Sequence, residues 1–93
     1  APWSATLALL AGAARVLRPE ARAPLVLYGP YRRGGRHTAE SNASFDAQLR
    51  ARDPSWGVRD LDDVVAEAEA RGLVLDEVVP MPANNLSVVL RRR

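Results

Sequence analysis

The sequence predicts a small α/β domain in which helices pack against a short sheet with a loop-rich edge. Residues 25–28 form an apolar run without alternation, which is typical of a strand buried on both faces. Apolar residues recur at helical spacing before this run, and two more strand-like runs, residues 73–79 and 86–90, follow near the end of the chain. A length of 93 residues allows one domain at most.

The first two helices are predicted from their apolar spacing and from possible capping residues. Ser4 is a plausible N-cap for a helix over residues 5–17. Ser41 could cap a second helix over residues 42–52. The apolar i, i+4 pair of this second helix is Phe45 and Leu49.

The third helix has the clearest boundaries. Asp60 is a good N-cap, and Asp62 and Asp63 follow in the first turn, where carboxylates interact favourably with the helix dipole. Gly72 stands where a left-handed residue is expected after the last turn. We therefore expect this helix to lead directly into the strand over residues 73–79.

This order of elements predicts a mixed three-stranded sheet. The crossover from the first strand to the second should be right-handed, and the last strand can turn back antiparallel between the other two. Residues 29–36 and residues 80–85, which read as a loop longer than a tight turn, would then meet at one edge of the sheet. Ligands of open α/β sheets bind beyond the carboxyl ends of strands, so this edge is the candidate site.

The composition argues against nucleic-acid binding, a metal site and a membrane-spanning segment. All 13 basic residues are Arg, 11 acidic residues are interspersed, and no repeated aromatic-basic motif predicts nucleic-acid binding. The chain has no Cys and a single His, so a metal site is not expected. No apolar run reaches the roughly 20 residues that span a bilayer, and the N-terminal residues lack a charged signal region. We expect a cytoplasmic protein without a membrane partner.

Three candidate substrate-binding residues lie in or just after the first loop. Tyr31 could line a pocket, and Arg33 could help to hold an anionic substrate, although a charge run in a loop is usually solvated. His37 could contact substrate or act as a base, because the pKa of histidine lies near neutrality; the alternative is an exposed loop histidine.

Three asparagines complete the candidate set. Asn42 could face the site or belong to a helix cap, and Asn84 and Asn85 are usual turn formers. Their interpretation as substrate-binding residues depends on the two loops meeting at the same edge. No residue stands out as catalytic.

Three segments resemble one family when they are taken in order. They are Leu-Tyr-Gly-Pro-Tyr at residues 27–31, the stretch from Glu40 to Asp60 with its Asp-Pro-Ser-Trp-Gly core, and Met-Pro-Ala-Asn-Asn-Leu-Ser at residues 81–87. The chain resembles the DUF938 (UPF0585) family, whose members resemble class I S-adenosylmethionine-dependent methyltransferases.

The resemblance implies the C-terminal half of a Rossmann-like methyltransferase fold, with strand order 5-7-6, as a single partial domain over residues 1–93. The Gly-rich turn and the acidic residue that bind the cofactor in that fold have no counterpart here. The complete protein would be a methyltransferase that uses S-adenosylmethionine. This chain alone should bind no cofactor and be inactive.

Two function classes stay open. The chain can be the substrate-side part of a methyltransferase that acts on a small molecule, or a non-catalytic α/β binding or assembly module. The resemblance also implies that the strand over residues 25–28 lacks a neighbour on one side, which leaves backbone groups open to pairing. The expected partner is the missing N-terminal half or a second copy of the chain.

Overall fold

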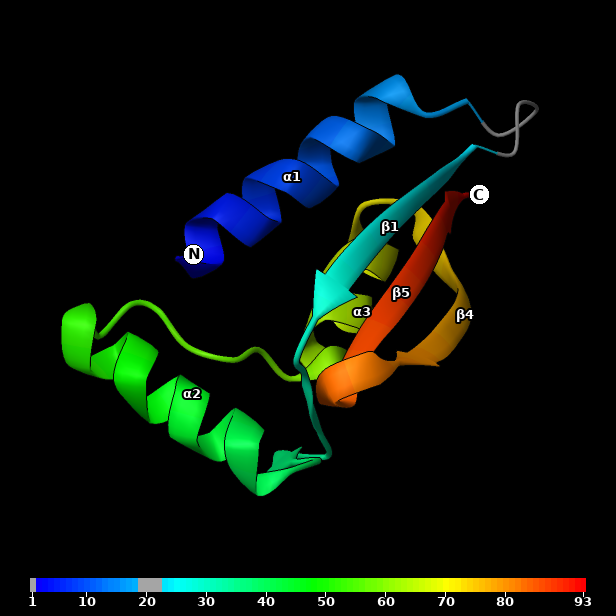
Figure 1. The fold of residues 1–93 in the computed structure, drawn as a ribbon. Helices are drawn as coiled ribbons and strands as arrows, with labels where there is room; N and C mark the ends of the chain where they lie inside the picture. Colours follow the sequence, from blue (N-terminus) through cyan, green and yellow to red (C-terminus); the bar gives the residue numbers. More distant parts are fainter. Residues whose placement is uncertain (1, 19–22) are drawn as a thin grey trace.

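The computed structural model describes residues 2–18 and 23–93 and has an α/β fold (Figure 1). Helices α1 and α3 pack on one face of a three-stranded sheet, and α2 lies beyond the carboxyl end of β1 (Figure 1). The elements in chain order are α1 (Trp3–Val16), β1 (Pro24–Gly29), β2 (Arg32–Arg33), β3 (Arg36–His37), α2 (Glu40–Arg52), α3 (Leu61–Ala70), β4 (Leu73–Met81), a 3₁₀ turn (Pro82–Asn84) and β5 (Asn85–Arg92).

The sheet has the order β1-β5-β4, so the last strand lies between the other two. Strand β5 runs antiparallel to both neighbours, with Val26 opposite Val89 and Val78 opposite Val88. The prediction of a mixed sheet is therefore wrong for these strands, because every hydrogen-bonded pair is antiparallel. Strands β1 and β4 do run in the same direction, but β5 separates them.

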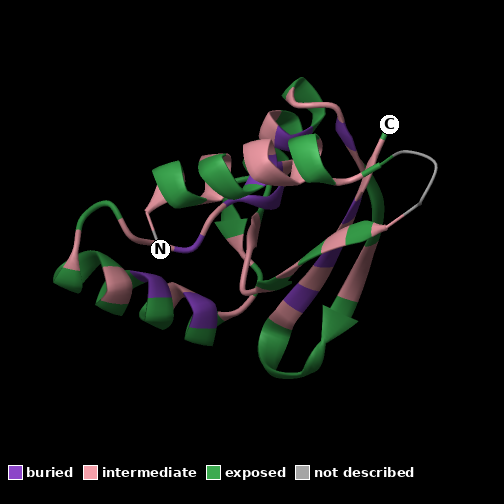
Figure 2. Ribbon diagram, turned by 90° about the horizontal axis from the view of Figure 1, so that it is seen from above, coloured by how far each residue is buried: buried purple, intermediate pink, exposed green. Residues whose placement is uncertain are grey.

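The core lies between the sheet and the helices α1 and α3. Leu10 is the buried residue of α1, and α3 contributes Leu61 and Ala68. The sheet side of this cluster consists of Leu73, Leu86, Val88 and Leu90. In β5 the buried residues alternate with half-buried ones, which is the period-2 pattern of a strand with one face on the core (Figure 2).

The other face of the sheet is open in the described part of the chain. Val26 and Tyr28 of β1 are 52% and 60% exposed, while Leu25 and Leu27 pack against the core. The prediction that this strand is buried on both faces is thus wrong here. An apolar run without alternation indicates two apolar faces, and only one of them is covered by α1 and α3.

The helix starts differ from the capping predictions in two cases out of three. Helix α1 begins at Trp3 with Pro2 in an extended conformation at the N-cap, so Ser4 lies inside the helix. Helix α2 begins at Glu40 with Ala39 at the N-cap, and Ser41 caps nothing. The third start is confirmed, since the Asp60 carboxylate accepts the N–H of Asp62 at 2.9 Å.

The connection between β4 and β5 is shorter than the sequence predicts. Both strands extend into residues 80–85 and leave a three-residue turn, Pro82–Asn84. Pro80 is tolerated in β4 because this strand lies at the edge of the sheet. Ala83 and Asn84 have φ values of 62° and 60°, so two consecutive residues other than glycine adopt the left-handed conformation.

Replacing Leu10 by Ala should lower the free energy of unfolding by about 2–5 kcal/mol, because it leaves a cavity under the sheet. The matched control is Leu9→Ala on the same helix, where the side chain is 49% exposed and the cost should stay below about 1 kcal/mol. Urea unfolding measures both. Equal losses for the two variants would contradict the placement of α1 on the core.

Candidate functional site

The two loops meet at the carboxyl end of β1. Gly29 lies opposite Leu86 in the sheet register, and the Asn85 amide nitrogen donates to the Tyr28 hydroxyl at 3.1 Å. The amide nitrogen of Asn42, which is buried, donates to the Asn84 carbonyl at 3.2 Å. This edge was predicted from the order of the strands, and the structure confirms that the loops converge there.

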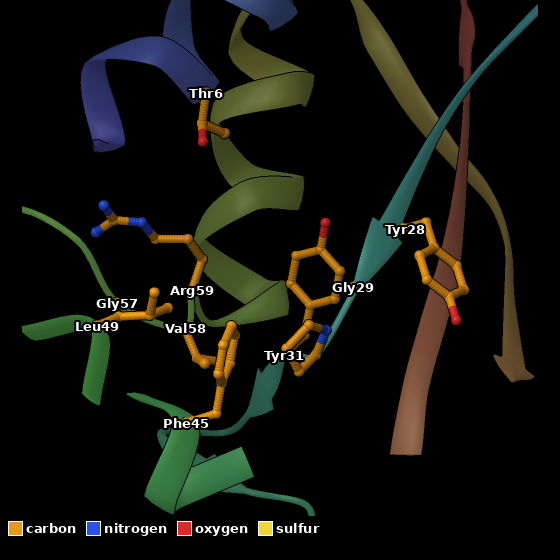
Figure 3. A pocket seen from close by; sticks show the side chains of 10 residues that line it. Thr6, Tyr28, Gly29, Tyr31, Phe45, Leu49, Gly57, Val58 and Arg59 are labelled. Carbon is orange, nitrogen blue, oxygen red and sulfur yellow. The ribbon is translucent and has the colours of Figure 1, made fainter. Parts of the chain in front are cut away.

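A cavity of about 210 Å³ opens at the same end of β1, and we call it the tyrosine cavity (Figure 3). Helices α1 and α2, the end of β1 and residues 57–59 form its walls. In Figure 3 the Tyr31 ring stands between these walls with its hydroxyl toward Thr6, whereas Tyr28 lies on the other side of β1. The lining residues are Thr6, Tyr28, Gly29, Pro30, Tyr31, Phe45, Leu49, Gly57, Val58 and Arg59.

Tyr31 is the polar group best placed to contact a ligand in the tyrosine cavity. Burial raises the pKa of its hydroxyl above the ordinary value of 10.0, so the group is protonated at neutral pH. Within the described residues this hydroxyl makes no hydrogen bond, although the ring packs against the core cluster. It can therefore donate to a ligand oxygen without losing a protein partner.

A second cavity, the arginine cavity, has a volume of about 260 Å³ and is lined by Trp3, Arg32, Arg59, Asp60 and Asp63. Arg59 lines both cavities, so the two adjoin. Its guanidinium carbon lies 5.3 Å from the centroid of the Trp3 ring, and its Nη2 donates to the Ser55 carbonyl at 2.7 Å. Burial first, and then the charges of neighbouring arginines, lower the pKa of the Arg59 guanidinium below its ordinary value.

The buried carboxylate of Asp46 joins the segments around the tyrosine cavity. Its Oδ1 accepts the Val58 N–H at 2.7 Å and the Arg50 Nε at 3.0 Å, and its Oδ2 lies 3.3 Å from the His37 Nε2. Burial alone would raise the pKa of Asp46. The bonds from Val58 and Arg50 and the nearby positive charge outweigh burial, and the pKa is lowered from 3.8.

Gly57 makes room for this contact. Its φ of 152° lies in the range that side chains rarely adopt, and an added Cβ would come within 2.9 Å of the Asp46 Oδ1. A glycine next to Val58 therefore lets the backbone approach the carboxylate closely enough to donate to it.

The other two candidate residues, His37 and Arg33, differ from each other in how far they are buried. His37 is half-buried against Asp46, and its Nδ1 is buried without a hydrogen-bond partner in the described residues. The alternative of an exposed loop histidine is therefore wrong. Arg33 is exposed on the β2–β3 hairpin and lines neither cavity.

Several residues of the site escaped the sequence prediction. Residues 29–36 were read as a loop, but β2 and β3 form a hairpin whose turn, Gly34-Gly35, has φ values of 59° and 78°. That dipeptide is a known hairpin signal. Asp46 was missed as well, although its spacing from Arg50 and Asn42 places three polar groups on one helix face. Nothing in the sequence distinguishes Arg59 from the other arginines.

Two further properties of the described residues bear on the class of site. No group of three or more His, Asp or Glu side chains among residues 2–18 and 23–93 could hold a metal ion. No helix in this part of the chain is both long and apolar enough to cross a membrane.

The fold and the cavities define an α/β sheet segment with a candidate small-molecule site at one edge. The chain belongs to the DUF938 family of proteins of unknown function, whose family model matches residues 1–92.

Two solved structures have a similar fold. The chain is similar to the pyocyanin biosynthetic protein PhzM, with 17% identity and a TM-score of 0.73, over 97% of this chain and 26% of that one. It is also similar to LaPhzM, with 16% identity and a TM-score of 0.74, over 94% of this chain and 25% of the other. The chain thus spans about a quarter of the length of these proteins.

Replacing Asp46 by Asn should lower the free energy of unfolding by about 1–3 kcal/mol at pH 7, because the charged acceptor for Val58, Arg50 and His37 is lost. Because the folded-state pKa is lowered, this contribution is complete at pH values above the unfolded-state pKa of about 3.9 and declines as the pH falls from there through the lower folded-state pKa. Urea unfolding at pH 7 and pH 3 measures the difference between the two proteins.

The control for this change is Asp76→Asn, which removes an exposed ion pair with Arg91. Its cost at pH 7 should be about 1 kcal/mol or less. A difference between Asp46→Asn and the unchanged protein that is as large at pH 3 as at pH 7 would contradict the role of the ionised carboxylate.

Proposed function

We propose that the chain is the substrate-side segment of a class I S-adenosylmethionine-dependent methyltransferase that acts on a small molecule. The observation that carries this proposal is the fold: nearly the whole chain superimposes on about a quarter of PhzM, a larger biosynthetic protein. The three sequence segments that resemble the methyltransferase-like DUF938 family support it. In this proposal β1, β4 and β5 correspond to strands 5, 6 and 7, which gives the spatial order 5-7-6.

The described residues do not fit the cofactor by themselves. Gly29 ends a strand, and Gly34 and Gly35 form the turn of a hairpin, so none of them lies in a Gly-rich turn between a strand and a helix. We therefore place the S-adenosylmethionine site in a separate N-terminal half and derive no step of the reaction through it. The chain, residues 1–93, is in this view one partial domain.

The residues of this chain would bind and orient the substrate. Tyr31 offers a protonated hydroxyl in the tyrosine cavity, next to the apolar walls. The bonds from Asn42 to Asn84 and from Asn85 to Tyr28 tie α2 and the β4–β5 turn to the end of β1. His37 supports the same region through Asp46. Arg33, exposed on the hairpin, could meet only a substrate group that extends beyond the cavity.

Calorimetric titration with S-adenosylmethionine tests whether the cofactor binds to this chain or requires the N-terminal half. The 93-residue chain should show no binding at micromolar concentrations, whereas a protein that joins these residues to the N-terminal half should bind the cofactor and transfer its methyl group. Micromolar affinity of the 93-residue chain would overturn the assignment of the cofactor site. Absence of binding by the longer protein would overturn the methyltransferase proposal itself.

We also propose that the free edge of β1 is covered in the working protein. Among the described residues β1 pairs with β5 alone, so one row of its backbone groups is open. An apolar cavity of about 370 Å³ adjoins β1, between it and α1, and includes Leu9 and Val16, which are 49% and 76% exposed. The partner would be the N-terminal half or, in its absence, a second copy of the chain.

Sedimentation at increasing concentration should therefore show that the 93-residue chain self-associates. Val16→Asp should weaken this association, because it places a charge beside the open edge. Arg93→Asp, another exposed residue, serves as the control for added negative charge. A stable monomer at high concentration, with rapid hydrogen exchange along the outer edge of β1, would contradict the proposal.

A further inference from the structure

Arg32 has a charge that the described protein does not neutralise by direct contact. Its side chain makes no hydrogen bond or ion pair with residues 2–18 and 23–93, and its Nε is buried without a partner. Burying part of a guanidinium without an acceptor is unfavourable. The backbone fixes the position of Arg32 nonetheless, because its N–H donates to the Arg59 carbonyl at 2.9 Å and it forms a bridge with Asp60.

Arg59 brings a second guanidinium to the same place. It shares the arginine cavity with Arg32 and also lines the tyrosine cavity. After burial, the repulsion from Arg50 and Arg32 is the main cause that lowers its pKa. A ligand anion between Arg32 and Arg59 would relieve this repulsion.

The nearby carboxylates have other contacts. The two oxygens of Asp60 accept the backbone N–H groups of Asp62 and Gly35. Asp46 is held by Val58, Arg50 and His37. Asp63 lies in the exposed first turn of α3 and forms no ion pair with Arg32.

The adjoining tyrosine cavity fits an apolar body. Phe45 is 45% exposed although it is an aromatic residue, and it faces this cavity beside Leu49 and Val58 (Figure 3). Tyr31 adds a second ring and a hydroxyl that has no hydrogen-bond partner in the part of the chain that the structure describes. Flat ligands gain from contact with such rings, while a single anionic group would fix their orientation.

We propose that the substrate is a small aromatic acid, whose ring occupies the tyrosine cavity against Tyr31 and Phe45 and whose carboxylate binds Arg32 and Arg59. A carboxylate matches the two-pronged geometry of a guanidinium. It also carries one charge, whereas a phosphate ester would carry about two beside Asp60 and Asp63. This assignment rests on the proposed function, since it names the substrate class of that site.

Binding of simple probes tests the assignment without any cofactor. Titration of the ¹⁵N-labelled chain with benzoate should shift the amide signals of Tyr31, Arg32 and Phe45. Benzyl alcohol, which keeps the ring and lacks the charge, should bind about tenfold or more weakly, the factor expected from losing one charge-assisted hydrogen bond. Inorganic phosphate, which lacks the ring, should bind more weakly than benzoate and leave the Phe45 signal unchanged.

Three variants separate the roles of the charge and the ring. Arg32→Gln should remove the preference for benzoate over benzyl alcohol, and Arg32→Lys should keep part of it because the charge is retained. Phe45→Ala should weaken both ring ligands. The matched control is Arg36→Gln on the β2–β3 hairpin, where the side chain is exposed and lines neither cavity, and it should change nothing.

Equal affinity for benzoate and benzyl alcohol, an equal loss in Arg36→Gln, or no binding of benzoate would overturn the proposal. Phosphate that competes with benzoate at equal affinity would also overturn it, since the site would then recognise an anion without a ring. Failure of the methyltransferase proposal is seen separately: benzoate would bind as described, but the longer protein would transfer no methyl group. Methyl transfer to neutral alcohols and aromatic acids alike would refute the acid preference alone.

Discussion

The candidate site depends on one buried carboxylate. The Asp46 carboxylate accepts hydrogen bonds from the Val58 N–H and the Arg50 side chain, and it lies beside the His37 imidazole. These three groups come from the segment after α2, from α2 itself and from the β2–β3 hairpin, respectively. None of these segments contributes to the main core cluster. A set of charge-assisted hydrogen bonds joins these segments, and such bonds are directional where apolar contacts are not. The Asp46 contacts thus hold α2 against residues 57–59, two walls of the tyrosine cavity, while apolar packing forms the core between the sheet and the helices α1 and α3.

Much of the fold follows from local signals in the sequence. The Asp60 cap and Gly72, with its φ of 84°, were predicted because each is a local solution to a backbone requirement at a helix end. The open face of β1 does not follow from the residues of the strand itself and is implied only by the family resemblance, in which the missing N-terminal half would cover it. The run over residues 25–28 shows that both faces of the strand are apolar, but it does not show whether the elements that cover them belong to this chain.

The same distinction applies to the site. The two loops meet because of the strand order, and the rules for connecting strands allow only a few such orders. The contacts of Asp46 and Arg59 depend on how α2 and residues 57–59 are placed in space. Charged residues on a helix or in a loop are solvated in most proteins, so the sequence gives no reason to select these two among 11 acidic and 13 basic residues.

The position of β5 in the centre of the sheet has a consequence for the order of folding. Within residues 2–18 and 23–93, strands β1 and β4 share no hydrogen bonds, and each pairs with β5. During synthesis, α1, β1 and the cavity-forming segments leave the ribosome before the strand that organises them exists. Until residues 85–92 are made, β1 and β4 lack the strand that joins them, so this non-local pairing forms late in synthesis.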